Sequence, residues 1–285
     1  MEQDIMAKIQ ASMPHFSKSQ KRLAQAVLKE YDKIAYITAA KLGVMAGVSE
    51  STVVRFANEL GFEGYPDFQH AVQELVRNKL THNQRIEVSE QRIGRDDVLR
   101  KVMNADIEKM RATLENIDHT AFAQAVESIL RARNIYILGV RSSASLASFL
   151  NFNLSLIFDN VKQVQPTSSS EVFEQLLSIG AEDVIFAISF PRYSSKVIHA
   201  VKFAREQHAT VIALTDSPNA PIARDATHLL TAQSDMASFV DSLTAPLSII
   251  NAVLVAVAQG KREEIRERFN RLENVWDEYQ VYVKQ

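Results

Sequence analysis

Apolar residues in the first part of the chain recur at helical spacing. Ser17-Lys-Ser-Gln20 has the pattern of a capping box, in which a serine N-cap is followed three residues later by a glutamine. Leu23, Val27 and Leu28 follow at the spacing of one helix face. The pattern therefore predicts an all-helical domain over residues 1–77.

The helical pattern fails after residue 77. Residues 78–97 are polar and show no periodicity, which is typical of a linker or hinge. We assign residues 78–105 to this linker and residues 106–285 to a second domain. We expect the two domains to change their relation over residues 78–97, and limited proteolysis to cut there first.

The second half contains five short apolar runs, separated by stretches long enough for helices. Continuous apolar strands that alternate with helices are typical of sheets buried on both faces. This pattern predicts an α/β domain with a five-stranded parallel sheet flanked by helices. The runs are Ile135–Leu138, which ends at Gly139, then Val161–Val164, Val184–Ile188, Thr210–Leu214 and Thr227–Thr231.

Residues 260–285 predict a charged helix with one apolar seam. The apolar positions are spaced four, three, four, three and four residues apart, as in a helix that packs against a partner helix. They are Ile265, Phe269, Leu272, Trp276, Tyr279 and Val283. Packing on its own domain explains the seam equally well, so the sequence leaves both interpretations open.

The composition narrows the class of protein. A length of 285 residues is enough for two domains, and a net charge of −2 leaves room for a local basic face. The chain has no cysteine, which excludes disulfides, thiolate catalysis and cysteine-based zinc sites. Residues 1–4 lack the basic start of a signal peptide, and the most apolar run, Ala245–Ala258, is too short to span a bilayer. We therefore expect a cytoplasmic protein without a membrane partner.

Residues 38–56 have the pattern of two short helices joined by a tight turn. The first helix is expected to run to about Ala46, with Gly47 at the turn, where a positive φ suits glycine best. Val48 is expected to be the buried turn residue, and Ser49 is placed to N-cap the second helix. In a helix-turn-helix the start of the second helix enters the major groove of DNA. An ordinary helical hairpin has the same spacing, so this pattern alone leaves two interpretations.

The predicted second helix carries short polar side chains at its start. Hydroxyl groups there can reach base edges or phosphates, and an arginine can contact phosphate or guanine. Lys18, Lys21 and Arg22, one helix earlier, could add phosphate contacts, although a solvated helix face is the simpler explanation for any one of them. The candidate DNA-binding residues are Ser49, Glu50, Ser51, Thr52, Arg55 and Lys18. The apolar residues expected to face the core are Val53, Phe56 and Leu60.

Three predicted strands run into turns that are rich in hydroxyl side chains. Ligands of parallel α/β sheets bind beyond the carboxyl ends of the strands, where helix N-termini favour phosphate. Serine hydroxyls add donors, and Arg141 and Arg192 add charge, so the edge suits a small phosphorylated, polyhydroxylated ligand. Each serine taken alone is explained as well by an ordinary N-cap. The turns are Gly139-Val-Arg-Ser142-Ser143, Thr167–Ser170 and Ser189-Phe-Pro-Arg-Tyr-Ser-Ser195.

An enzyme would need a catalytic base at the same edge. His228 lies on or beside the fifth predicted strand, and Asp235 and Asp241 follow that strand as the best-placed carboxylates. No pair stands out by its spacing, so we predict no catalytic residues. The sequence also lacks the spacing of a metal site and the glycine-rich loops of nucleotide sites, so we predict no metal and no cofactor.

The two constellations together resemble the RpiR/MurR family of bacterial regulators. Residues 46–56, Ala-Gly-Val-Ser-Glu-Ser-Thr-Val-Val-Arg-Phe, and residues 60–68, Leu-Gly-Phe-Glu-Gly-Tyr-Pro-Asp-Phe, look like the helix-turn-helix of that family. The second half looks like a sugar isomerase (SIS) domain. The resemblance implies phosphosugar contacts from Ser142, Ser143, Ser189, Tyr193 and Ser194. Arg192 is added because it lies in the same loop.

We therefore predict a transcriptional regulator of sugar metabolism whose affinity for its operator changes when a phosphosugar binds. The resemblance implies a homodimer or homotetramer, and two-fold symmetry then calls for a palindromic operator. The loop Ser-Phe-Pro-Arg-Tyr-Ser replaces the Ser-x-Ser-Gly-x-Thr loop of catalytic SIS domains, which favours sensing over turnover. The alternative is a phosphosugar isomerase with an N-terminal interaction domain. A third interpretation is a regulator whose helical domain docks a protein.

Overall fold

The computed structural model describes residues 5–79, 84–86, 96–165, 168–234 and 240–282. The chain divides into two compact units, Met1–Arg85 and Ile86–Gln285. The division falls inside the segment that the sequence assigned to the linker.

Unit 1 is all-helical, as the apolar pattern predicted. Its helices are α1 (Ile5–Ser12), α2 (Lys18–Ile34), α3 (Ala39–Ala46), α4 (Glu50–Glu59) and α5 (Tyr65–Lys79). The predicted capping box is confirmed at the start of α2. The Ser17 hydroxyl accepts from the Gln20 amide at 3.3 Å, and the Ser17 amide donates to Gln20 Oε1 at 2.9 Å. Two backbone donors that a helix start leaves unpaired are thereby satisfied.

Aromatic rings hold α4 and α5 together in the core of unit 1. Phe56 of α4 packs with its ring centroid 5.2 Å from that of Phe16 and 5.8 Å from that of Phe68. The Tyr65 hydroxyl donates to the carbonyl of Ile37 at 2.7 Å, which fastens α5 to the loop before α3. Burial raises the pKa of Tyr65 to about 12, so the phenol keeps its proton and this bond at ordinary pH.

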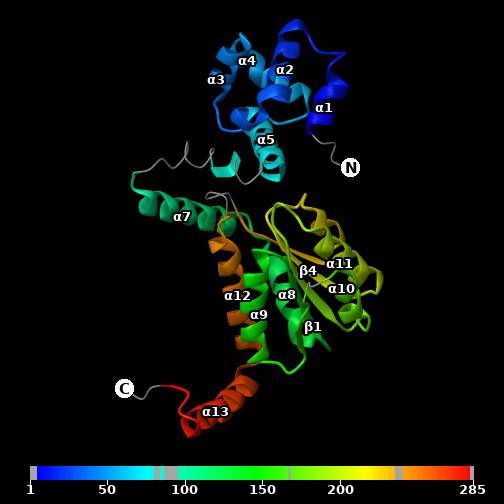
Figure 1. Cartoon of the computed structure of the whole chain (residues 1–285), viewed down its shortest axis with the longest axis vertical. Helices are drawn as coiled ribbons and strands as arrows, with labels where there is room; N and C mark the ends of the chain where they lie inside the picture. Colours follow the sequence, from blue (N-terminus) through cyan, green and yellow to red (C-terminus); the bar gives the residue numbers. More distant parts are fainter. Residues whose placement is uncertain (1–4, 80–83, 87–95, 166–167, 235–239, 283–285) are drawn as a thin grey trace. The chain divides into compact units, whose positions relative to one another are not determined.

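Unit 2 contains a five-stranded parallel sheet with the strand order β2-β1-β3-β4-β5. Figure 1 shows this sheet together with the helices that pack against it. The predicted α/β fold with five parallel strands is confirmed. The strands are β1 (Ile135–Gly139), β2 (Val161–Gln163), β3 (Val184–Ile188), β4 (Thr210–Thr215) and β5 (His228–Thr231). The helices are α7 (Val98–Asn116), α8 (His119–Arg131), α9 (Ser143–Ser155), α10 (Ser169–Leu176), α11 (Ser195–Glu206), η1 (Pro221–Asp225), α12 (Thr244–Gly260) and α13 (Arg262–Glu278).

Helices cover both faces of the sheet, which explains the continuous apolar runs. Successive residues of β1 point to opposite faces. Ile135 and Ile137 pack in a core with α8, α9 and α12, whereas Tyr136 and Leu138 pack in a second core with α10 and α11.

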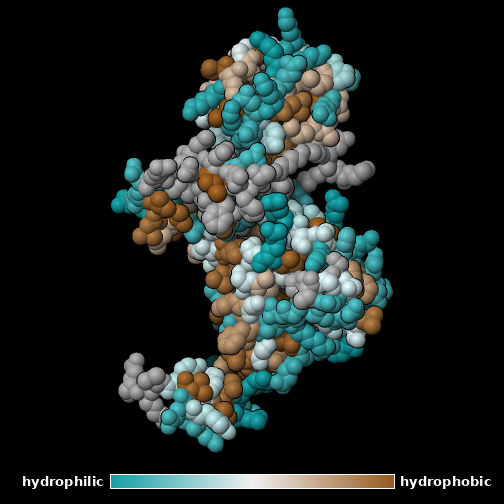
Figure 2. Space-filling model, viewed as in Figure 1, coloured by the Kyte–Doolittle hydropathy of each residue, from teal (hydrophilic) through white to brown (hydrophobic). Residues whose placement is uncertain are grey.

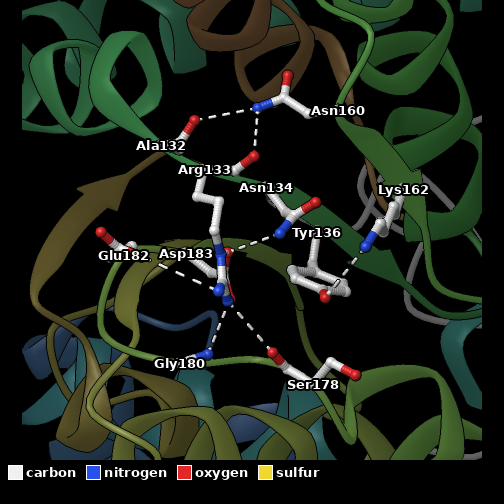
Figure 3. Close-up of polar contacts among 10 residues, drawn as sticks. All are labelled: Ala132, Arg133, Asn134, Tyr136, Asn160, Lys162, Ser178, Gly180, Glu182 and Asp183. Atoms are coloured by element: carbon white, nitrogen blue, oxygen red, sulfur yellow. Dashed lines mark hydrogen bonds and ion pairs between the residues drawn. The ribbon is translucent and has the colours of Figure 1, made fainter.

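At the amino edge of the sheet, the buried carboxylate of Asp183 joins the segments that precede two strands (Figure 3). Asp183, next to β3, accepts from Arg133 Nε and Asn134 Nδ2, each at 2.9 Å, and from the Gly180 amide at 2.8 Å. These donors precede β1 or lie in the turn before β3. The contacts therefore align the starts of two neighbouring strands.

Helix α7 begins at Val98, so residues 98–105, which the sequence assigned to the linker, are helical. The hinge predicted over residues 78–97 lies partly outside the described residues. Thr113 of this helix is buried, and Asp106 accepts a hydrogen bond from Ser242 in the segment before α12. These contacts attach α7 to the α/β unit.

The charged helix predicted at the C-terminus is α13. Its seam residues Ile265, Phe269, Leu272 and Trp276 are half-buried, Tyr279 is exposed, and Val283 lies outside the described residues. Neither interpretation of the seam is thereby decided. In the part of the chain that the structure describes, no single helix is long and apolar enough to cross a membrane. Among the described helices, one pair, α12 and α13, is together long and apolar enough, but the two helices are bent by 98° to each other.

Candidate DNA-binding and ligand-binding sites

Two glycines allow α3 and α4 to pack closely around a tight turn. Gly47 ends α3 with a φ of 64°, as the sequence predicted, and the Val48 amide donates back to the Gly43 carbonyl at 2.8 Å. A Cβ on Gly43 would lie only 2.8 Å from the Val48 carbonyl oxygen. A larger residue at position 43 would therefore force the two helices apart, whereas at position 47 it would be strained by the positive φ.

The burial of the turn and of α4 follows the prediction with one exception. Val53, Phe56 and Leu60 are buried, as expected. Val48 was expected to be buried but is only half-buried. The reason is that the backbone of Val48, rather than its side chain, makes the close contact with α3.

The start of α4 presents an exposed group of hydroxyls. Ser49 is the N-cap residue by position, but its side chain makes no capping hydrogen bond. Its Oγ lies 2.9 Å from Ser51 Oγ and 2.8 Å from Thr52 Oγ1. Glu50 and Arg55 are exposed on the same helix. Helix amides without a side-chain acceptor, hydroxyls and one guanidinium can together contact phosphate or base edges.

The structure separates the basic residues of α2. Gln20 Nε2 donates to Glu59 Oε2 at 3.4 Å, so the first turn of α2, which begins at Lys18, lies beside the end of α4. The Arg22 guanidinium lies beside Gly47, 3.4 Å from the place that a Cβ would take. The Arg22 guanidinium therefore lies beside the turn that precedes α4.

The carboxyl ends of four strands in unit 2 lie side by side. Gly139 of β1 pairs with Ile188 of β3, which pairs with Leu214 of β4, which pairs with Leu230 of β5. The turns after these strands therefore begin at one edge of the sheet.

The turn after β1 brings α9 tightly onto the strand. A Cβ on Gly139 would lie 2.4 Å from the Ser143 carbonyl oxygen, so only glycine fits there. Ser142 is the N-cap residue of α9 but makes no side-chain capping bond, and it is exposed. Ser143 is buried next to it. Arg141 is exposed and has a φ of 59°.

The turn after β3 places a second serine in the same way. Ser194 is the N-cap residue of α11 and also makes no side-chain capping bond. Ser189 is buried, and its amide donates to the Leu214 carbonyl at 3.1 Å. Arg192 is exposed, and the Tyr193 hydroxyl donates to Asp216 Oδ1 at 2.9 Å.

The turn after β2 differs from these two. Ser168 Oγ accepts from the Glu171 amide at 3.1 Å, so this serine is an ordinary N-cap of α10. Ser170 Oγ lies 3.1 Å from Ser168 Oγ. Thr167, which the sequence placed in the same turn, lies outside the described residues.

The sequence reasoning missed a fourth polar turn, directly after β4. Thr215, the last residue of β4, is buried together with Asp216 and Ser217, and its Oγ1 donates to Asp216 Oδ1 at 3.2 Å. Three polar residues directly after the apolar residues Val211–Leu214 were the available signal. They place one carboxylate at the same edge as the serine turns.

Among the residues considered for catalysis, His228 lies at the opposite end of its strand from this edge. His228 is the first residue of β5, and its Nε2 lies 3.1 Å from Ser128 Oγ. Burial lowers the pKa of His228. Asp235 lies outside the described residues, and Asp241 is half-buried. Among the described residues, no group of three or more His, Cys, Asp or Glu side chains could hold a metal ion.

An apolar cavity of about 450 Å³ lies between α7, α8 and α12. Met110, Leu114, Phe122 and Ile249 are among the residues that line it. Its lining is too apolar to hold a polyhydroxylated ligand.

Two domain families match the chain. The helix-turn-helix domain of the rpiR family matches residues 3–79, and the SIS domain matches residues 128–256. The HTH-type transcriptional regulator HexR of Escherichia coli is 27% identical over an alignment of 289 positions, and this alignment covers 96% of this chain and 95% of HexR.

Solved structures agree with the observed fold. The sugar isomerase domain of an RpiR transcription factor from Sphaerobacter thermophilus is 26% identical, with a TM-score of 0.58 over 61% of this chain and 97% of that chain. The Vibrio vulnificus NanR protein, complexed with ManNAc-6P, is 20% identical, with a TM-score of 0.60 over 98% of this chain and 100% of that chain. The chain belongs to the RpiR family of helix-turn-helix transcriptional regulators that carry a SIS domain.

Proposed function

We propose that this regulator binds a palindromic operator through α4, and that a phosphosugar at the carboxyl edge of the sheet changes its affinity for that operator. One observation carries the ligand part of the proposal. Ser142 and Ser194 stand at the N-termini of two helices that follow neighbouring strands, and neither hydroxyl is used as a cap. Hydroxyls and helix amides without such a bond suit a phosphate group.

The chemistry of the edge also supports a sugar. Tyr193 and Asp216 add a phenol and a carboxylate beside the serines, and both groups exchange hydrogen bonds with sugar hydroxyls. Ser143, Ser189 and Arg192 belong to the same two turns. The ManNAc-6P in the NanR structure supports testing phosphorylated amino sugars first.

We propose sensing without turnover. Asp216 is a carboxylate at this edge, and its Oδ1 already accepts from Tyr193 and Thr215. A general base needs a lone pair directed at the substrate proton. The rival function, phosphosugar isomerisation, predicts interconversion of hexose and amino-sugar phosphates by the purified protein.

A homodimer or homotetramer is part of the proposal because an operator palindrome requires two copies of α4. Apolar side chains are exposed on α7, and Figure 2 shows them as a patch on this helix. The exposed apolar residues of this helix include Leu99, Met103, Ile107, Met110 and Leu114. Exposed apolar patches of this kind mark interaction surfaces.

Arg55→Ala tests the DNA part. Loss of one base or phosphate contact should weaken binding to a duplex selected from a random-sequence pool by about 5- to 150-fold. Lys29→Ala is the matched control, since it removes one exposed positive charge from α2 at a residue outside the candidate site. Fluorescence anisotropy measures both dissociation constants. Equal binding by the two variants would show that α4 is misplaced on DNA.

A thermal-shift panel of sugar phosphates and their unphosphorylated parents tests the ligand part. A ligand that binds only the folded state raises the melting temperature by mass action. We expect shifts from phosphorylated compounds alone. Shifts from the parent sugars alone, or from no compound at millimolar concentration, would contradict a phosphosugar effector.

A further inference from the structure

A chain of hydrogen bonds starts in the proposed ligand turn. The Tyr193 hydroxyl donates to Asp216 Oδ1 at 2.9 Å, and Thr215 Oγ1 donates to the same oxygen at 3.2 Å. Thr215 and Asp216 are both buried. The turn after β3 is therefore tied to the end of β4 through a carboxylate with little access to water.

The chain continues across the sheet to the end of β5. The Ala232 amide donates to the Thr215 carbonyl at 2.8 Å. The next two residues then leave the sheet and bond elsewhere: the Gln233 amide donates to Thr113 Oγ1 at 2.9 Å, and Ser234 Oγ donates to the Ser242 carbonyl at 3.0 Å.

Both branches end on α7. Thr113 belongs to α7, and Ser242 Oγ donates to Asp106 Oδ1 of the same helix at 2.6 Å. Thr244 Oγ1 donates to Asp106 Oδ2 at 3.0 Å. Burial alone would raise the pKa of Asp106, but the hydrogen bonds from Ser242 and Thr244 hold it below its usual value. The group is therefore a charged acceptor at neutral pH.

Helix α7 is also the first helix of unit 2 after the division at Arg85, apart from the residues that the structure leaves undescribed. In the chain, α7 therefore lies between the DNA-binding unit and the rest of unit 2. A change in the position of α7 changes the point to which unit 1 is attached.

We propose that Asp106 and Thr113 are positioning residues that couple the ligand edge to DNA binding through α7. The inference rests on the proposed function, because it assumes both a ligand at the edge and a DNA-binding unit. A ligand that contacts Tyr193 competes with, or strengthens, the bond to Asp216. If the ligand binds one position of α7 more tightly than another, it shifts the protein toward that position, and operator affinity changes with it.

The test measures a coupling ratio. We define it as the dissociation constant for the selected duplex with a saturating sugar phosphate divided by the constant without it. The sugar phosphate is the compound with the largest thermal shift in the panel. In Asp106→Ala and in Thr113→Val, the ratio should move toward one by roughly 2- to 30-fold. Ligand affinity and ligand-free DNA affinity should stay at wild-type values.

Glu108→Ala is the matched control. Glu108 is an exposed carboxylate of the same helix, and its partner is Arg111 on that helix, so its loss should leave the coupling ratio unchanged. A merely structural role for Asp106 would lower the melting temperature without moving the ratio. Thr113→Val, which keeps the side-chain shape, decides the question where Asp106→Ala does not fold.

The outcomes separate this inference from the proposed function. A coupled wild-type protein, with variants that keep its ratio, would overturn the role of Asp106 and Thr113 alone. A wild-type ratio of one would overturn the proposed function, and this inference with it.

Discussion

The two edges of the sheet in unit 2 use polar groups in opposite ways. At the amino edge, Asp183 accepts from Arg133, Asn134 and the Gly180 amide, so its oxygens are fully engaged by the protein. At the carboxyl edge, Ser142 and Ser194 sit at helix N-termini without capping bonds. Groups already paired within the fold stabilise it, whereas groups without such partners can bind a ligand without breaking a native contact.

Within the carboxyl edge the same contrast recurs between serines. Ser168 caps α10 through a hydrogen bond, although its turn is rich in hydroxyl side chains like the other two turns. A serine at a helix start is therefore no evidence for a ligand until its hydrogen bonds are known. The comparison predicts a graded series of substitutions. At one end, stability falls strongly and sugar-phosphate affinity is kept; at the other end, stability is kept and sugar-phosphate affinity falls.

Asp183→Ala should have the largest effect on stability. Asp183 is buried, and its removal leaves the Gly180 amide and Asn134 Nδ2 without their acceptor, at about 1–3 kcal/mol for each unpaired group. Because the Arg133 side chain is half-exposed, water screens the charge left behind, and we expect about 3 kcal/mol in all. Urea unfolding measures this loss. Sugar-phosphate affinity of the folded variant should be unchanged, and a large loss of affinity would break the comparison.

The same carboxylate predicts a pH dependence. Burial alone would raise the pKa of Asp183, but the hydrogen bonds from Arg133 and Asn134 outweigh it and lower the pKa. A group with a lowered folded pKa stabilises above its unfolded value, about 3.9 for Asp, and this contribution disappears as the pH falls through the folded pKa. Stability of the wild type should therefore fall more steeply below about pH 4 than that of Asp183→Asn. Parallel profiles would contradict this.

Ser168→Ala should have an intermediate effect. Loss of an N-cap serine costs about 1 kcal/mol of stability. Ligand affinity should remain, because the hydroxyl already serves the helix. Thermal unfolding, with and without the sugar phosphate, measures both quantities. An unchanged stability together with lost ligand binding would assign Ser168 to the ligand site instead.

The double variant Ser142→Ala with Ser194→Ala should change stability least, by no more than about 0.5 kcal/mol. Its ligand affinity should fall by about 100-fold, because the charged phosphate of the ligand loses its hydrogen bonds with both hydroxyls. Isothermal titration gives the affinity, and Ser168→Ala serves as the matched serine control. Wild-type affinity in the double variant would remove these hydroxyls from the site.

The sequence predicted the architecture because burial on both faces of a parallel sheet leaves a clear record in apolar runs. All five runs became strands, with ends displaced by one residue at most. Gly47 was predictable for a similar reason, since a positive φ strongly favours glycine.

Features that depend on tertiary contacts were not predictable. The polar character of residues 78–97 was extended too far along the chain, although Leu99, Met103 and Ile107 have helical spacing. The hydrogen bond between Tyr193 and Asp216 was not predictable, because nothing in the sequence shows that these two residues are neighbours in space. The difference between Ser168 and Ser142 lies in backbone geometry, which composition does not encode.

The central claim is that a ligand at the carboxyl edge changes DNA affinity. The most direct measurement is the anisotropy of the labelled selected duplex, titrated with protein at a series of sugar-phosphate concentrations. We predict a dissociation constant that shifts by about 5- to 150-fold with ligand in the wild type, and by far less in the Ser142→Ala, Ser194→Ala double variant. A constant that is independent of the sugar phosphate in the wild type, at concentrations that raise its melting temperature, would contradict the claim.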